Sequence, residues 1–109
     1  MQDRDTRHRI TEEEVRRLKE IVGPIADRYG VERMWLFGSR ARGDARPDSD
    51  YDFLISKGRI RSLFVLGGLL ADLEDAVGTK VDLVMDTCND QEFVQDVRKD
   101  EVLLYEQAR

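Results

Sequence analysis

The sequence predicts a single small α/β domain, a mixed sheet with helices packed on it. Apolar runs near residues 33–37, 51–56, 80–85 and 102–105 have the length of buried strands. Between them lie two longer segments, 12–29 and 60–77, whose apolar residues recur at helical spacing. The 109 residues suffice for one compact domain with a modest core.

The first helix is marked at both ends. Thr11 and Glu14 have the spacing of a capping box, and Gly30 is placed to end the helix. Gly23 and Pro24 should kink this helix or split it. We interpret the helix as scaffold.

The strand at 33–37 ends abruptly at Gly38, and a short helical turn carrying Arg40 and Arg42 is expected after it. The connection to the strand at 51–56 is too short for a crossover helix, so these two strands should be antiparallel. We interpret Trp35 as a core residue, with a place beside a bound ligand as the alternative.

The second helix, about 60–77, should bury one apolar stripe. Its members are Leu63, Leu66, Leu69, Leu70, Leu73 and Val77. Phe64 lies away from that stripe, near the small residues Gly67, Gly68 and Ala71. This small-residue shelf is either a local packing contact or a docking face for another chain.

The remaining elements close the domain. A strand is expected at 80–85, with Asp86 as a turn acid after it. Asn89 should cap the last helix, with Glu92 completing a capping box. The side chains expected to dock this helix are Phe93, Val94 and Val97.

Composition excludes several classes of protein. The net charge of −5, with acids and bases mixed, argues against a general nucleic-acid binder. The sequence has one histidine, His8, which excludes zinc clusters and histidine-dependent catalytic triads. It has one cysteine, Cys88, which excludes an internal disulfide and fits a reducing cytoplasm. No apolar run could span a bilayer. We expect residues 1–9 to form a flexible tail and 10–109 a single cytoplasmic domain.

Two carboxylates open the strand at 51–56. Asp50 and Asp52 stand at alternate positions, so their side chains should project side by side. Two such charges repel unless a cation lies between them, and Mg²⁺ is usually held by one or two carboxylates plus substrate phosphates. Gly38 and Ser39 could receive those phosphates on their backbone amides. The pattern therefore predicts a nucleoside triphosphate site.

Three further residues belong to this prediction. Arg40 or Arg42 could clamp a phosphate, or could pair with a neighbouring acid instead. Asp82 is a carboxylate within the apolar strand Val81 to Val84, which is costly unless the group is paired or metal-bound. A structural acid held by a backbone amide is the alternative, but because two other aspartates lie at a strand end we assign Asp82 to the same site.

These motifs together resemble a known family. The glycine-serine pair at 38–39, the R-x-R-G turn at 40–43, S-D-x-D at 49–52 and Asp82 on a later strand occur in the order seen in the minimal nucleotidyltransferases of the DNA polymerase β-like superfamily. The resemblance covers almost the whole chain. It implies the small polymerase β-like fold.

The resemblance also implies a reaction. Two Mg²⁺ ions held by Asp50 and Asp52, with Asp82 near one of them, would promote attack of an acceptor hydroxyl on the α phosphorus of ATP or another NTP. Asp82 would be a general base or only a metal ligand. Nothing in the sequence selects the base of the nucleotide.

Similar minimal members are antitoxins of HEPN–MNT pairs, which transfer AMP to a hydroxyl of a HEPN-domain RNase toxin. The chain has no acceptor domain of its own, so we expect another protein or a second copy to present the acceptor. Two alternatives remain open. One is a catalytically silent antitoxin that acts by binding alone, and the other is a subunit of an aminoglycoside-type nucleotidyltransferase.

Overall fold

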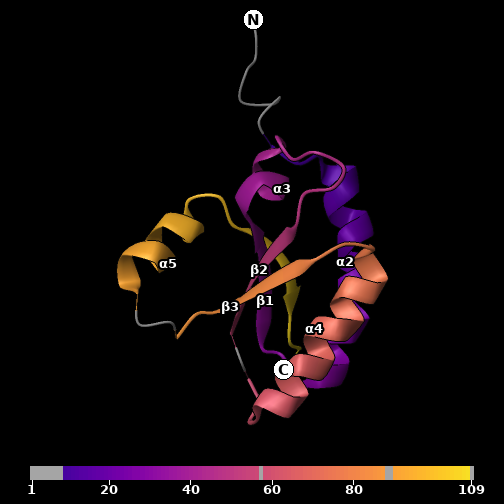
Figure 1. Ribbon diagram of the computed structural model, residues 1–109, viewed down its shortest axis with the longest axis vertical. Coiled ribbons are helices and arrows are strands. Elements are labelled where there is room, and N and C mark those ends of the chain that lie inside the picture. Colours follow the sequence, from indigo (N-terminus) through magenta and orange to yellow (C-terminus); the bar gives the residue numbers. More distant parts are fainter. Residues whose placement is uncertain (1–8, 57, 88–89, 109) are drawn as a thin grey trace, which may run out of the picture.

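The computed structural model describes residues 9–56, 58–87 and 90–108. Helices and strands alternate along these residues and build one four-stranded sheet with helices on both of its faces (Figure 1). The elements are, in order, α2 (Glu12–Tyr29), β1 (Arg33–Phe37), α3 (Gly38–Arg42), β2 (Tyr51–Ser56), α4 (Leu63–Val77), β3 (Val81–Met85), α5 (Gln91–Arg98) and β4 (Val102–Glu106). The predicted α/β class and mixed sheet are confirmed.

The sheet has the strand order β3-β2-β1-β4. β1 is antiparallel to both β2 and β4, as the short connection after β1 predicted for the first pair. β2 and β3 are parallel, and α4 makes the crossover between them. The parallel pair places the start of β3 beside the start of β2, at the end of the sheet next to α3 (Figure 1).

Helix α2 begins and ends where the sequence predicted. Thr11 accepts a hydrogen bond from the Glu14 amide, and the Glu14 carboxylate accepts one from the Thr11 amide. Gly30 ends the helix in the left-handed conformation, with φ of 77°. Pro24 lies inside one continuous helix, so the predicted split does not occur. Leu18, Val22, Ile25 and Ala26 of α2 are buried in the main core, and this packing offsets the cost of a proline inside the helix.

The start of α4 corrects the sequence interpretation. The helix begins at Leu63 rather than near Ile60, because Ser62 caps it by accepting a hydrogen bond from the Val65 amide. Leu63 is 84% exposed and does not join the buried stripe. Ile60, in the loop before the cap, is buried in its place. Other members of the predicted stripe, Leu69 and Leu73 among them, lie in the core.

The small-residue shelf on α4 is not one continuous surface. Phe64 is 90% exposed, and a side chain at Gly67 would meet open space. Gly68 instead lies against the ring and hydroxyl of Tyr29 on α2. Packing therefore accounts for Gly68, while Phe64 and Gly67 face outward.

The last helix also begins later than predicted. Asp90, not Asn89, is its N-cap and accepts a hydrogen bond from the Phe93 amide, so the predicted box with Glu92 is wrong. Asn89 and Cys88 lie outside the described residues. Val94 and Val97 are buried as expected. Phe93 is partly exposed and meets the edge of the Phe37 ring, with centroids 6.4 Å apart.

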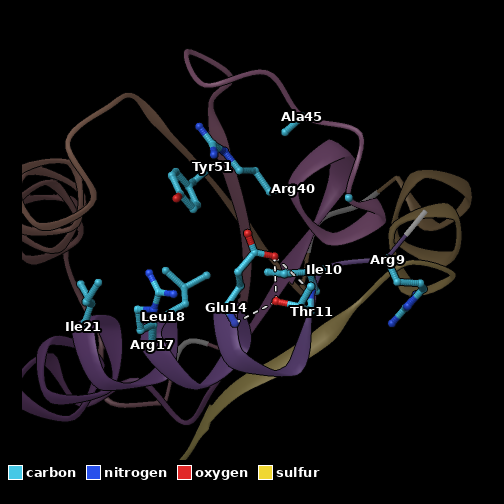
Figure 2. Close-up of a pocket in the computed structure, with 11 residues that line it drawn as sticks. Arg9, Ile10, Thr11, Glu14, Arg17, Leu18, Ile21, Arg40, Ala45 and Tyr51 are labelled. Carbon is cyan, nitrogen blue, oxygen red and sulfur yellow. Dashed lines mark hydrogen bonds between the residues drawn. The ribbon is translucent and has the colours of Figure 1, made fainter. Parts of the chain in front are cut away.

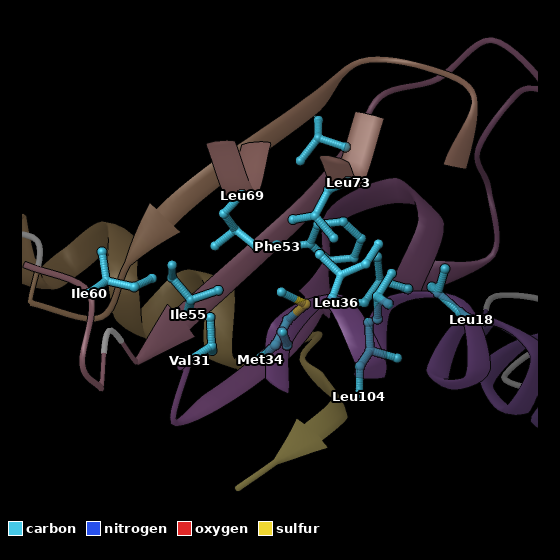
Figure 3. Close-up of a cluster of buried hydrophobic side chains, with 14 of the residues drawn as sticks. Leu18, Val31, Met34, Leu36, Phe53, Ile55, Ile60, Leu69, Leu73 and Leu104 are labelled. Atoms are coloured by element: carbon cyan, nitrogen blue, oxygen red, sulfur yellow. The ribbon is translucent and has the colours of Figure 1, made fainter. Parts of the chain in front are cut away.

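The main core fills the space between the sheet and the pair α2 and α4 (Figure 3). Its largest fully buried side chains come from the centre of the sheet and from α4: Phe53, Met34, Leu36, Ile55, Leu69 and Leu73. A smaller cluster of Phe37, Leu54 and Val97 lies on the opposite face, under α5. Trp35 packs against this smaller cluster, so its interpretation as a core residue holds in part. Within the described residues, no helix is long and apolar enough to cross a membrane.

Candidate active site

The predicted carboxylates lie where the parallel strands begin. Asp52 on β2 and Asp82 on β3 are register partners, and Asp50 directly precedes β2. Side chains alternate along a strand, so Asp52 and Asp82 project from the face opposite to Phe53 and Leu83, which belong to the main core. Asp50 and Asp82 are exposed and Asp52 is half-buried, so this end of the second face is open to solvent.

Asp52 carries the clearest electrostatic conflict in the described chain. Burial raises the pKa of Asp52 to about 6, and a hydrogen bond with Asp82 and the negative charges of Asp82 and Asp50 act in the same direction. The positive charge of Arg42 opposes this increase in the pKa. A carboxyl group in this position keeps its proton up to about pH 6 and, once ionised, is stabilised by a nearby cation.

Asp82 lies in a different environment from the one the sequence suggested. It is exposed, and its neighbours Leu83 and Val84 are only partly buried. β3 is an edge strand, so it lacks a neighbour on its outer side. The cost of burying an unpaired carboxylate therefore does not explain Asp82. Its approach to Asp52 makes it a candidate site residue.

The turn at Gly38 is shaped for close contact with Asp52. Gly38 has φ of 77°, and a Cβ atom there would overlap the Asp52 carboxylate. Only glycine satisfies both conditions at little cost. The residue before α3, Phe37, supplies no side-chain hydrogen bond to the helix, so α3 has no side-chain cap. The first amides of α3, at Gly38 and Ser39, thus begin a short helix directly beside the carboxylates.

The two arginines of this turn have separate surroundings. Arg40 donates through Nη2 to the carbonyl oxygens of Pro47 and Ser49, at 3.1 and 2.7 Å, and its guanidinium lies 4.2 Å from the centre of the Tyr51 ring. Tyr51 stacks on Phe53, on the main-core side of β2. Arg40 is therefore separated from Asp52 by the strand and holds the loop before β2.

Arg42 lies on the carboxylate side. It donates to Asp100, at 3.1 Å, and to Asp44, at 3.4 Å. Asp100 follows α5 in the chain, so this ion pair ties the turn at α3 to the end of α5. The sequence analysis left phosphate binding and salt bridging open for both arginines. Each makes polar contacts within the chain, and only Arg42 is near Asp52.

A divalent cation fits this donor set without a preformed cage. Among the described residues, no group of three or more acidic, histidine or cysteine side chains is close enough to enclose a metal ion. Asp52 and Asp82 are register partners on adjacent strands, and the negative charges of Asp82 and Asp50 both raise the pKa of Asp52. Mg²⁺ commonly uses one or two carboxylates and completes its shell with phosphate oxygens and water.

Sequence reasoning missed two features of this region. Asp100, the partner of Arg42, has no motif around it and is joined to the site only by tertiary contact. A cavity of about 640 Å³ lies between α2 and the loop before β2 (Figure 2). Its lining residues are far apart in the sequence. The one sequence signal for the cavity is strand alternation, which places the Tyr51 side chain on the face opposite to Asp52.

Comparisons with known proteins agree with this fold. The family described as polymerase beta, nucleotidyltransferase matches residues 19–109. A relative named protein adenylyltransferase MntA, from Thermococcus cleftensis, is 43% identical over 61 residues, which are 56% of this chain and 62% of that protein. The chain therefore spans somewhat less than two thirds of that relative.

Two solved structures are similar in fold. A protein provisionally identified as a minimal nucleotidyltransferase is 33% identical, with a TM-score of 0.71 over 83% of this chain and 92% of that chain. The second structure contains the tri-AMPylated HEPN toxin of Shewanella oneidensis in complex with an MNT antitoxin. It matches with a TM-score of 0.66, at 18% identity, over 85% of this chain and 73% of that chain. The second likeness concerns the fold alone.

Proposed function

Because this chain belongs to the polymerase beta nucleotidyltransferase family, we propose that it transfers AMP from ATP to a hydroxyl group of a HEPN-type toxin and neutralises the toxin in this way. The observation that carries the proposal is the pairing of Asp52 with Asp82, beside Asp50 and the glycine turn. Nucleotidyl transfer needs clustered acids next to a phosphate-binding turn.

Mg²⁺ bound by Asp50 and Asp52 would neutralise the triphosphate and lower the pKa of the acceptor hydroxyl. The amides of Gly38 and Ser39 are oriented by the start of α3 and bind phosphate oxygens. Arg42, fixed by Asp44 and Asp100, adds positive charge on the same side of the sheet. These residues would hold the triphosphate on the carboxylate side of the sheet.

We assign to Asp82 the role of proton acceptor, with a role as metal ligand as the alternative. It is more exposed than Asp52 and lies on the edge strand, where a large acceptor can approach. The acceptor oxygen forms a bond to the α phosphorus while the bond from that phosphorus to the β-phosphate bridging oxygen breaks. Pyrophosphate leaves, AMP stays on the acceptor, and the hydroxyl proton passes to Asp82.

A protein acceptor is supported by the names of similar proteins. The Thermococcus relative is named a protein adenylyltransferase, and the Shewanella structure contains an AMP-modified HEPN toxin. The uncovered face beside Asp82 suits a partner that brings its own hydroxyl group to the strand edge.

Mass spectrometry of the intact acceptor tests this function. The purified chain is incubated with ATP, Mg²⁺ and a HEPN-domain protein from the same genome, alongside the Asp50→Asn/Asp52→Asn variant. We expect the acceptor to gain one or more AMP masses with the wild-type chain and none with the variant. Asp75→Asn, a change of the same kind on the exposed side of α4, should retain transfer. An acceptor that stays unmodified but is inhibited equally by all three proteins would replace transfer by inhibition through binding.

A further inference from the structure

The cavity of Figure 2 is lined by Tyr51, whose side chain projects from the face of β2 opposite to that of Asp52. One wall is formed by the residues just before α2 and by α2 as far as Ile21, and the other by α3, the loop after it and the first residue of β2. Its volume of about 640 Å³ is within the usual range of ligand pockets. The proposed nucleotide site does not use it.

The walls of the cavity combine an apolar floor with a positive rim. Ile10, Leu18 and Ile21 contribute aliphatic surface, and Ile21 is 41% exposed. Arg9, Arg17 and Arg40 form the positive rim, and Arg40 also donates to the carbonyl oxygens of Pro47 and Ser49. The remaining charged residue is Glu14, whose carboxylate already accepts two hydrogen bonds from Thr11.

This positive rim contrasts with the rest of the molecule. The chain has a net charge of −5, yet the charged residues of this cavity are three arginines and one glutamate. Arg17 is 64% exposed and pairs only with Glu13 within the described chain, at 3.3 Å. An occupant with carboxylates next to apolar side chains would match both the rim and the floor.

The cavity is also close to the candidate active-site carboxylates. Tyr51 lines it, and the residues on either side of Tyr51 are Asp50 and Asp52, whose side chains project from the other face. Ala45, in the loop that leads to Asp50, lines it too. A chain segment bound in the cavity thus has to pass only the start of β2 to reach the carboxylates.

We propose that this cavity is a docking site for an acidic, apolar segment of the acceptor protein, and that it holds the acceptor while its hydroxyl group reaches Asp82. The proposal rests on the proposed function for the identity of the acceptor. Docking supplies affinity for the acceptor and takes no part in nucleotide binding. It therefore gives a chain of this size a way to select its acceptor.

NMR spectroscopy of the labelled full chain tests the docking chemistry without catalysis. The probe is the blocked peptide Ac-Glu-Phe-Glu-Leu-Glu-NH2, titrated without nucleotide or metal. We expect saturable changes in the amide signals of Ile10, Leu18, Ile21, Ala45 and Tyr51. The same peptide with lysine in place of glutamate should cause none. Equal changes with both peptides, changes only around Phe64, or no changes would overturn the proposal.

A matched pair of charge reversals tests the role in the acceptor complex. Arg17 and Arg16 are neighbours on α2, are 64% and 63% exposed, and each pairs with a glutamate four residues away. Arg17 lines the cavity and Arg16 does not. We expect Arg17→Glu to raise the Kd of the probe peptide and the KM for the HEPN acceptor about tenfold or more, with the KM for ATP unchanged. Arg16→Glu should change neither value.

The two proposals fail in different ways. Peptide binding that depends on Arg17, without any AMP transfer, would leave the docking site in place and remove the proposed reaction. AMP transfer with the same acceptor KM in Arg17→Glu and Arg16→Glu would keep the reaction and overturn the docking site.

Discussion

At the scale of single residues, Asp52 is the position where packing and charge conflict. Its carboxylate is partly buried, faces two other acids and touches the Gly38 turn. The pKa of Asp52 is raised to about 6 by burial first and by Asp82 and Asp50 next. Such a group weakens the free chain and is well suited to receive a cation, because the cation removes the cause of the destabilisation.

The pH dependence of stability should reveal this conflict. The native chain holds the Asp52 proton more tightly than the unfolded chain, since the pKa rises from 3.8 to about 6 on folding. Stability in EDTA should therefore fall as pH rises from about 4 to about 6, and then stay level. Asp52→Asn has no such proton, so we expect it to be more stable than wild type near pH 8 and equal to it near pH 4.

Urea unfolding at several pH values between these limits measures the difference. Asp75→Asn on the exposed side of α4 serves as the control and should follow wild type throughout. Adding Mg²⁺ near pH 8 should stabilise wild type and leave Asp52→Asn largely unchanged. A constant difference between Asp52→Asn and wild type at all pH values would contradict the assignment of the raised pKa.

At the scale of elements, α4 shows how two identical neighbours acquire different roles. Gly67 and Gly68 both lower the helical propensity of α4. A Cβ atom at Gly67 would meet open space, whereas at Gly68 it would lie 3.2 Å from the Tyr29 hydroxyl oxygen. That hydroxyl donates a short hydrogen bond to Asp72, at 2.6 Å. Gly68 thus permits the close contact of α4 with α2.

We expect alanine to act in opposite directions at these two positions. Gly67→Ala should stabilise the protein by about 1 kcal/mol, because alanine restores helical propensity without a new contact. Gly68→Ala should give no gain or a net loss, because Tyr29 would have to move away from Asp72. Thermal unfolding measures both, and a change of this size corresponds to about 4 °C. Equal stabilisation by both variants would show that the contact with Tyr29 has no energetic weight.

At the scale of the whole molecule, the two faces of the sheet differ. One face carries the main hydrophobic core, and one end of the other face carries the candidate active-site carboxylates. The large core lies between the sheet and the pair α2 and α4, and the smaller cluster lies under α5. Asp52 and Asp82 project from the second face, where Asp82 is exposed. Strong packing on the first face allows unfavourable charges to gather on the second.

Truncation of leucines on the two faces should separate these contributions. Leu69 on α4 is fully buried, so Leu69→Ala should cost about 2–5 kcal/mol. Leu103 on the edge strand β4 is 41% exposed, so Leu103→Ala should cost about 0.5 kcal/mol or less. Chemical denaturation measures both free energies. Similar costs for the two leucines would place the stabilising core elsewhere.

Local patterns were enough to predict most elements and the candidate carboxylates. The capping box at Thr11, the left-handed glycine at Gly30 and the limits of β1 and β2 depend on residues near in sequence, and the structure confirms them. Alternation predicted that Asp50 and Asp52 lie side by side, and the family resemblance added Asp82, which the structure pairs with Asp52 in register. Their catalytic role stays a prediction.

Only the tertiary structure decided which of several possible partners each side chain meets. Leu63 fits a helical stripe but is exposed, because the Ser62 cap starts α4 just beyond the edge of the core. The sequence offered the same two roles for Arg40 and Arg42, yet their side chains lie on opposite faces of β2. Arg42 pairs with Asp100, which follows the C-terminal end of α5. Sequence periodicity shows which face of a helix or strand is apolar. Contacts between residues that are distant in sequence depend on how the elements pack together.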